Sequence, residues 1–221
     1  MRDLFGGSHL PDVCDTPCVD ISIQLRTTDA SAVKNGSMGG DVWLVIGVQA
    51  SGKSTVADLL ARRFDRGVHL QGGQFYRWAV RGWVHHDDAD RSQARRHLEL
   101  RYRLSAMAAD EYCASGFSTV VQDNIYGPDV VAWLGSVRAR PRHLVVLRPT
   151  LEVVAQRDAD RTAAAGKVAY KIGGDTIASL DAQLADTPRL GLWLDTSEMS
   201  PEDVVDSIVA QEDRAAIDAH I

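Results

Sequence analysis

The chain has 221 residues, of which 45% are apolar and 24% are charged, a balance that is typical of a soluble globular domain. The formal net charge of −6 argues against general nucleic-acid binding, because such binding normally needs a basic surface. Three cysteines are too few for a disulfide framework. No apolar run is long enough to span a membrane, and the N-terminus lacks the apolar core of a signal peptide, so we expect a cytoplasmic protein.

Residues 1–40 differ in composition from the rest of the chain. They contain scattered acids, prolines and glycines, and they end in Lys-Asn-Gly-Ser-Met-Gly-Gly at 34–40, which is typical of a flexible linker. The stretch 19–25 alternates apolar and polar residues in the way that a strand does. We therefore predict a partly flexible tail over 1–40 and one globular domain over 41–221.

From residue 41 onward, short apolar runs alternate with segments of helical periodicity. The apolar runs predict strands at 42–46, 67–71, 118–122, 142–147 and 190–195. The other segments predict helices at about 53–64, 74–81, 91–115, 127–138, 150–165, 175–185 and 201–212. Nearly continuous apolar strands that alternate with helices indicate a parallel sheet covered on both faces, so the predicted fold class is three-layer α/β.

The first predicted strand leads directly into a phosphate-binding motif. Residues 47–54 read Gly-Val-Gln-Ala-Ser-Gly-Lys-Ser and match the P-loop pattern G-x-x-x-x-G-K-[ST]. In such a loop, backbone N–H groups and the positive end of the following helix bind phosphate oxygens. Lys53 is placed to reach the β- and γ-phosphates of ATP, and Ser54 to ligate Mg²⁺. The predicted nucleotide-binding residues here are Gly47, Gln49, Ala50, Ser51, Gly52, Lys53, Ser54 and Thr55.

Two further features favour phosphoryl transfer. Asp123 follows an apolar strand, where a carboxylate can hold a Mg²⁺-bound water or activate a hydroxyl; a turn or capping acid before Asn124 is the alternative. Arg157 and Arg161 lie four positions apart, and therefore on one face of a predicted helix. Guanidinium groups on one face suit a polyphosphate, and a surface ladder with neighbouring acids is the alternative.

Together these features resemble the small-molecule kinases of the P-loop class, most closely the chloramphenicol phosphotransferase and zeta-toxin-like group, and more distantly adenylate and gluconate kinases. The resemblance covers residues 42–211. It implies a P-loop NTPase fold with a five-stranded parallel sheet of order 2-3-1-4-5 and an arginine-bearing lid helix. It also implies that Arg157 lies near the adenine, that Arg161 lies near the transferred phosphate, and that Thr196 and Ser197 belong to the adenine-side loop.

One position departs from the pattern of these kinases. After the second strand they carry a Gly-Asp pair, but this chain has Gly72-Gly73, so glycine stands where the base or magnesium-shell acid is expected. Another group can supply the base, and Asp123 is the first candidate; the others are Asp87, Asp88, His85 and His86. A loose transition state can also need little base. The third alternative is a protein that binds ATP without efficient transfer.

The acceptor pocket is implied between the second strand, its helix and the lid. The predicted substrate-binding residues there are Gln74, Arg77, His85 and Asn124, and Arg77 is placed to hold an acidic or phosphorylated acceptor. The segment 85–88 is either a polar connection or a wall of this pocket. The helix at 91–113 carries five arginines, which we expect to be mostly solvated and paired with Glu99 and Asp110, with one or two facing an anionic acceptor.

The sequence therefore predicts an ATP-dependent phosphotransferase that acts on a hydroxyl of a small molecule, such as a metabolite or an antibiotic. The predicted catalytic residues are Lys53, Asp123, Arg157 and Arg161, and the predicted Mg²⁺ ligands are Ser54 and Asp123. One alternative is a polynucleotide 5′-hydroxyl kinase, which the acidic balance of the chain disfavours. The other is a non-catalytic or weakly active ATP-binding regulator, for which Gly73 is the main support.

Overall fold

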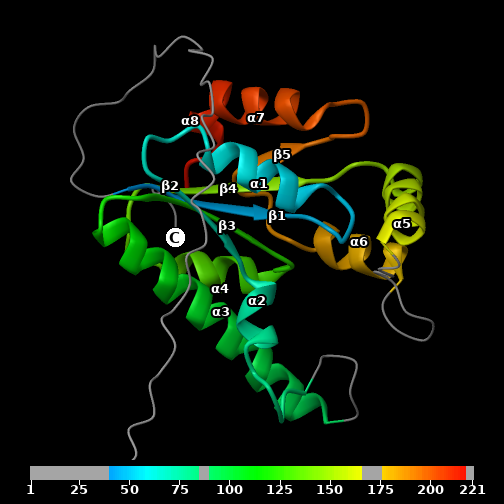
Figure 1. Ribbon diagram of the computed structural model, residues 1–221, viewed down its shortest axis with the longest axis horizontal. Coiled ribbons are helices and arrows are strands. Elements are labelled where there is room, and N and C mark those ends of the chain that lie inside the picture. The colour runs from blue at the N-terminus through cyan, green and yellow to red at the C-terminus, as the bar shows by residue number, and fades with distance from the viewer. Residues whose placement is uncertain (1–39, 85–89, 166–175, 218–221) are drawn as a thin grey trace, which may run out of the picture. The chain divides into compact units, whose positions relative to one another are not determined.

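The computed structural model describes residues 40–84, 90–165 and 176–217, all within one of the two units into which the chain divides, Ser37–Ile221. In this part of the chain, five parallel strands form one sheet: β1 (Val42–Ile46), β2 (Gly67–Gln71), β3 (Ser118–Asp123), β4 (Arg142–Leu147) and β5 (Leu192–Leu194). Their order is β2-β3-β1-β4-β5, which confirms the predicted topology (Figure 1). The predicted strand at 19–25 and the segment 85–88, with His85, lie outside the described residues.

Helices lie on both sides of this sheet. In chain order they are α1 (Lys53–Ala61), α2 (Gly73–Arg77), α3 (Arg91–Ala114), α4 (Pro128–Ser136), α5 (Leu151–Ala165), α6 (Ile177–Ala185), α7 (Pro201–Ala210) and α8 (Glu212–Ala215). α1 and α7 pack against each other on one face, and α3 and α4 cover the other (Figure 1). The predicted three-layer α/β class is confirmed. Among the described helices, none combines the length and apolar character that crossing a bilayer requires.

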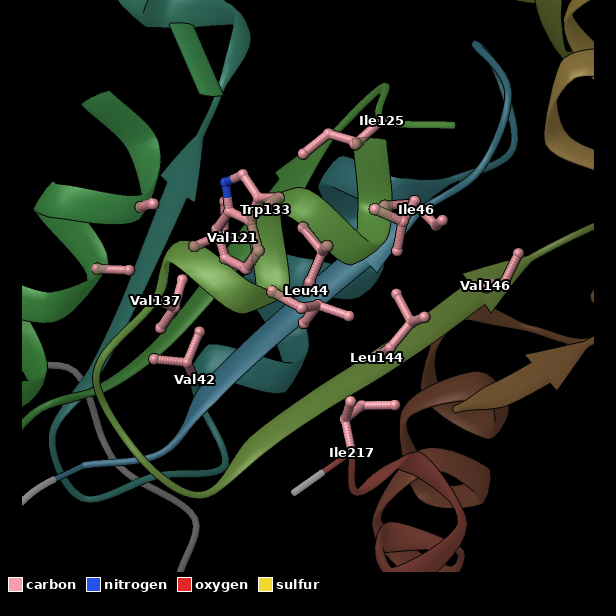
Figure 2. Close-up of a cluster of buried hydrophobic side chains, with 14 of the residues drawn as sticks. Val42, Leu44, Ile46, Val121, Ile125, Trp133, Val137, Leu144, Val146 and Ile217 are labelled. Atoms are coloured by element: carbon pink, nitrogen blue, oxygen red, sulfur yellow. The ribbon is translucent and has the colours of Figure 1, made fainter. Parts of the chain in front are cut away.

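The central strand β1 explains how the layers are held together. All five of its residues are apolar and buried. Leu44 and Ile46 point to the face of α3 and α4, where they share a cluster with Trp133 of α4 (Figure 2). Trp43 and Val45 point to the face of α1 and α7. A strand that is buried on both faces gives a continuous apolar run in the sequence, which is why its bounds are predictable.

The helix predicted at 74–81 is wrong in its second half, because α2 ends at Arg77. The residues that follow have no partner surface to cover: the side chain of Trp78 is 69% exposed and that of Val80 is 100% exposed. A short helix depends on burying one face against the rest of the protein, and this segment buries none. Gly82 then adopts a φ of 84°, outside the right-handed helical region. The other predicted bounds differ from the observed ones by three residues or fewer.

The parallel sheet brings the carboxyl ends of β1, β2 and β3 to one edge, which in open α/β sheets is the edge where ligands bind. β3 is one residue longer than predicted, so that Asp123 is its last residue and pairs in register with Ile46 of β1. On the other side, Gln71 of β2 pairs with Gln122. The residues that follow β1 and β2, including Gly72, therefore lie around Asp123.

Candidate functional site

A cavity of about 740 Å³ lies at this carboxyl edge. Its walls come from the loop after β1, from α1, α2 and α3, from the segment after β3, and from α5 and α6. The volume lies in the range that small-molecule sites occupy. The cavity brings together most of the predicted site residues, namely Gln49, Ala50, Gly52, Lys53, Ser54, Thr55, Arg77, Asp123, Asn124, Arg157 and Arg161.

Several predicted residues do not line the cavity. Gly47 and Ser51 support the loop from behind, since Ser51 is 2% exposed and a Cβ on Gly47 would lie 2.7 Å from Ser51 Oγ. Gln74 turns to Gln71, with 3.4 Å between Nε2 and Oε1. Thr196 and Ser197 lie after β5: the carbonyl oxygen of Thr196 accepts a hydrogen bond from Arg157, and Oγ of Ser197 accepts one from the backbone N–H of Thr150.

The loop between β1 and α1 adopts the backbone conformation of a ligand-binding turn. Gly52 caps α1 with φ 95° and ψ 3°, which lies in the left-handed region where glycine has no steric penalty. Ala50 also has a positive φ, of 65°, which is uncommon for a residue with a side chain. Strained residues of this kind are typical of loops whose N–H groups converge on a ligand.

Lys53 is the first residue of α1 and is buried beneath this loop. Its Nζ donates a hydrogen bond to the carbonyl oxygen of Val48 at 2.6 Å. Burial lowers the pKa of Lys53 from 10.5 to about 7; the positive charge of Arg161 also lowers it, and the carboxylate of Asp123 opposes both effects. The ammonium group is therefore only partly charged at neutral pH before an anion binds.

This lowered pKa predicts proton uptake when a nucleotide binds. Phosphates favour the charged form of Lys53, so its pKa is higher in the complex than the value of about 7 in the free protein. ATP affinity therefore falls as the pH rises above 7. We expect an uptake of about one proton per site near pH 8, and none from this group near pH 6, where the lysine is already charged. Calorimetry in two buffers of different ionisation enthalpy measures the uptake. In the control Lys53→Met it should vanish, and equal uptake in the two proteins would contradict the prediction.

The two arginines of α5 both reach the loop side of the cavity. Arg157 donates to two carbonyl oxygens, from Nη1 to Ser51 at 3.4 Å and from Nη2 to Thr196 at 3.1 Å. It therefore joins the loop to the segment after β5. Arg161 pairs with Asp158 of its own helix, but its Nε is buried with no hydrogen-bond partner among the residues that the structure describes. The guanidinium of Arg161 therefore has one buried donor that no described residue uses.

Asp123 lies opposite the loop and is 4% exposed. Its Oδ1 accepts the backbone N–H of Asn124 at 2.7 Å and forms an ion pair with Nη2 of Arg101 at 2.9 Å. Its Oδ2 is buried, and no described residue gives it a hydrogen bond. Burial raises the pKa of Asp123, while Arg101, the Asn124 N–H and Lys53 act in the opposite direction. A carboxylate with a raised pKa and one unused oxygen suits a general base.

The backbone of Gly72 lies directly against this unused oxygen. A Cβ built on Gly72 would lie 2.0 Å from Asp123 Oδ2 and 2.4 Å from its Cγ, which is closer than any side chain can approach. A Cβ on Gly73, by contrast, would meet only Cε1 of Tyr76, at 3.6 Å. Of the two glycines after β2, it is therefore Gly72 that the carboxylate requires, whereas the sequence reasoning considered only Gly73.

Of the two pairings predicted for the arginines of α3, the one with Glu99 is confirmed and the one with Asp110 is wrong. Arg95 does pair with Glu99, but it also binds Asp129 through two hydrogen bonds of 2.7 and 2.8 Å. Asp110 pairs with Arg138, from the segment after α4, and not with an arginine of its own helix. Arg101 is not solvated, because its side chain is 13% exposed and paired with Asp123.

One sequence signal predicts the buried position of Arg101. It lies three positions after Leu98 and four before Ser105, and these two residues belong to the apolar stripe that α3 turns inward. An arginine within such a stripe needs a buried partner. The sequence does not show which carboxylate this is, because Asp123 lies 22 positions further along the chain.

A family model described as an AAA domain matches residues 42–185, which is more than half of the chain and includes the whole phosphate loop. The chain belongs to this AAA domain family. No curated protein matches the sequence.

Several solved structures with the same fold as this chain are kinases. A sugar kinase from Janibacter is 21% identical, with 80% of this chain and 96% of the other covered and a TM-score of 0.55. An APS kinase from Mycobacterium tuberculosis, in complex with AMPPNP and APS, is 16% identical, with 79% and 98% covered and a TM-score of 0.59. A chain of the Pnkp1/Rnl/Hen1 RNA repair complex is 14% identical, with 71% and 46% covered and a TM-score of 0.52. The predicted resemblance to P-loop kinases is confirmed at the level of the fold.

Proposed function

We propose that the protein is an ATP-dependent phosphotransferase that moves the γ-phosphate to a hydroxyl group of a small molecule. The observation that carries this proposal is the cavity in which a P-loop lysine and two arginines face a buried carboxylate with an unused oxygen. Cations on one wall suit the triphosphate, and a base on the other suits the hydroxyl that attacks it.

On the donor side, the loop N–H groups and Lys53 bind the β- and γ-phosphates. Arg157, which already bridges the loop and Thr196, extends toward the adenine, and Arg161 stabilises the charge on the transferred phosphate. The hydroxyl of Ser54 and the carboxylate of Asp123 both line the cavity and are oxygen donors of the kind that Mg²⁺ prefers. When bound there, Mg²⁺ supplies charge neutralisation at the β- and γ-phosphates.

On the acceptor side, Arg77 and Asn124 offer polar groups, and Tyr76 and Leu98 offer apolar surface. Arg77 has no ion pair with any described residue, so its guanidinium is free to bind an acidic acceptor. The volume of about 740 Å³ has to hold both the nucleotide and the acceptor, which favours a small molecule over a polynucleotide.

Asp123 is our candidate for the base that the missing acid at Gly73 would otherwise supply. Among the described residues, the other carboxylate in the cavity is that of Asp129, and both of its oxygens are taken by Arg95. Phosphoryl transfer passes through a loose transition state in which positioning and charge stabilisation dominate, so one carboxylate is sufficient.

The proposal is tested by incubating the protein with Mg²⁺, γ-labelled ATP and a panel of sugars, sugar acids, nucleosides and hydroxylated antibiotics. We expect labelled product from at least one acceptor, and loss of that product in Asp123→Asn. Tight ATP binding without transfer to any acceptor would overturn the proposal in favour of a nucleotide-binding regulator. Labelling of a 5′-hydroxyl oligonucleotide alone would overturn it in favour of a polynucleotide kinase.

A further inference from the structure

Arg148 and Asp181 form an ion pair that joins the start of α5 to the middle of α6. Nε of Arg148 donates to Oδ1 of Asp181 at 3.0 Å, and Nη2 donates to Oδ2 at 2.9 Å. Both side chains are partly buried, and neither of them lines the cavity. Two parallel hydrogen bonds between a guanidinium and a carboxylate fix orientation as well as distance, so this pair sets how the two helices meet.

The start of α5 is fixed to the sheet, but the rest of the helix is not. The backbone N–H of Arg148 donates to the carbonyl oxygen of Leu194, the last residue of β5, at 2.9 Å. The N–H of Thr150 donates to Oγ of Ser197 at 2.9 Å. Beyond this point, Val154 is the one fully buried residue among those of α5 whose burial the structure describes. The direction of α5 therefore depends on what packs beside it.

The helix that packs beside α5 is α6 (Figure 1). Leu180 and Leu184 bury α6 in an apolar cluster, and apolar contacts of this kind are not directional. Past the end of α6, Oγ of Thr187 accepts the backbone N–H of Gly127 at 2.8 Å, which holds that end to the segment after β3. Asp181 lies between the two leucines in the sequence. Its ion pair is the directional contact that ties α6 to the start of α5.

Arg161 is the cavity residue that depends most on this support. Arg157 is held by two carbonyl oxygens that lie outside α5. Arg161 lies one turn further from the start of the helix, and its ion pair is with Asp158 of the same helix, a partner that moves with it. Its charge is nevertheless near enough to Lys53 to lower the pKa of that lysine. The place of Arg161 beside the phosphate loop therefore follows from the direction of α5.

We propose that Arg148 and Asp181 are positioning residues for the donor nucleotide: they hold α6 against α5 and so keep Arg161 at the γ-phosphate. This inference rests on the proposed function, which assigns Arg161 to that phosphate. ADP has no γ-phosphate, so an arginine in this place strengthens the binding of a triphosphate and not that of ADP. Because the ion pair lies outside the cavity, its effect on binding should appear only in the preference for the triphosphate.

Calorimetry with Mg²⁺, ADP and the non-hydrolysable analogue AMPPNP tests this inference without any acceptor. The proteins compared are the wild type, Arg148→Gln, Asp181→Asn, Arg161→Gln and the double variant Arg148→Gln/Arg161→Gln, with folding checked by circular dichroism. We expect Arg148→Gln and Asp181→Asn to raise the Kd for AMPPNP about 10-fold, because a hydrogen bond to a charged group is lost. The Kd for ADP should stay within about twofold of the wild-type value.

The double variant shows whether the ion pair acts through Arg161. If it does, adding Arg148→Gln to Arg161→Gln raises the Kd for AMPPNP no further. The exchange variant Arg148→Asp/Asp181→Arg restores opposite charges and should recover part of the lost affinity. The matched control is Arg63→Gln, which removes the ion pair of Arg63 with Asp206 of α7, outside the cavity, and should leave both Kd values unchanged. Equal weakening of AMPPNP and ADP in Arg148→Gln, or losses that multiply in the double variant, would overturn the positioning role.

Binding and transfer are measured separately, so this inference and the proposed function can fail independently. The expected pattern of Kd values in a protein that phosphorylates no acceptor would overturn the proposed function and support the role of the ion pair. Transfer to an acceptor, with an unchanged Kd for AMPPNP in Arg148→Gln, would overturn only the role of the ion pair. A Kd for AMPPNP that does not change in Arg161→Gln would overturn the inference together with the assignment of Arg161 to the γ-phosphate.

Discussion

Replacing Lys53 by alanine is expected to lower kcat/KM for ATP by about 10²- to 10³-fold, because the variant loses a preorganised cation in a site that excludes water. Lys53 is buried, and its Nζ donates a hydrogen bond to the neutral carbonyl oxygen of Val48. A phosphate would be a stronger partner for this ammonium group. Its ammonium lies near enough to Asp123 and Arg161 for each to affect its pKa. Loss of this charge therefore affects both the binding of the triphosphate and the charge balance around the proposed base.

The fold should tolerate this change. A buried ammonium that donates one hydrogen bond to a carbonyl costs desolvation, so its removal is expected to leave the free energy of unfolding within about 1 kcal/mol of the wild-type value. Urea denaturation measures this quantity, and calorimetry measures nucleotide affinity. Lys53→Met serves as the matched variant, because it keeps the apolar stem and removes only the charge. A folded Lys53→Ala protein with wild-type affinity and turnover would contradict the assignment of the phosphate loop.

The loop at 47–54 could be predicted because its residues are consecutive. An apolar strand, eight residues of loop and a helix carry their own pattern, and the backbone geometry of Gly52 and Ala50 follows from that loop. The five strands could also be predicted, since parallel strands that are buried on both faces give short apolar runs in the sequence. Each of these features depends on residues that are neighbours in the chain, so a single sequence is enough to predict it.

The rest of the cavity could not be predicted in the same way, because its residues come from distant segments. Arg101 and Asp123 meet only because α3 crosses the carboxyl edge of the sheet beside β3. α6 contributes Leu180 and Gln183 to the cavity, and no motif marks either of them. The sequence pattern drew attention to the acid missing at Gly73, whereas the close contact with the carboxylate is made by its neighbour Gly72.

Gly72→Ala is expected to lower phosphoryl transfer by about 10²- to 10³-fold, close to the full contribution of a general base. The backbone of Gly72, with φ −56° and ψ −33°, is one that alanine adopts without strain, so the effect is purely steric. The new methyl group would lie 2.0 Å from Asp123 Oδ2, and Asp123 cannot retreat without breaking its 2.9 Å pair with Arg101. Overpacking of this kind typically costs about 1–3 kcal/mol of stability, which urea denaturation detects.

Gly73→Ala is the matched control, since it adds the same methyl group one position later, where the nearest atom is Tyr76 Cε1 at 3.6 Å. Alanine is a better helix former than glycine by about 0.5–1 kcal/mol, so this variant should be as stable as the wild type or more so, and should lose less activity than Gly72→Ala. The change is also made in an Asp123→Ala background, which removes Oδ2 and Cγ and leaves only Cβ, at 3.0 Å. There, adding Gly72→Ala should cost less stability than it costs in the wild type, and both Asp123→Ala proteins should be slow because the carboxylate is gone. Wild-type stability and turnover in Gly72→Ala would show that Oδ2 does not lie against this backbone.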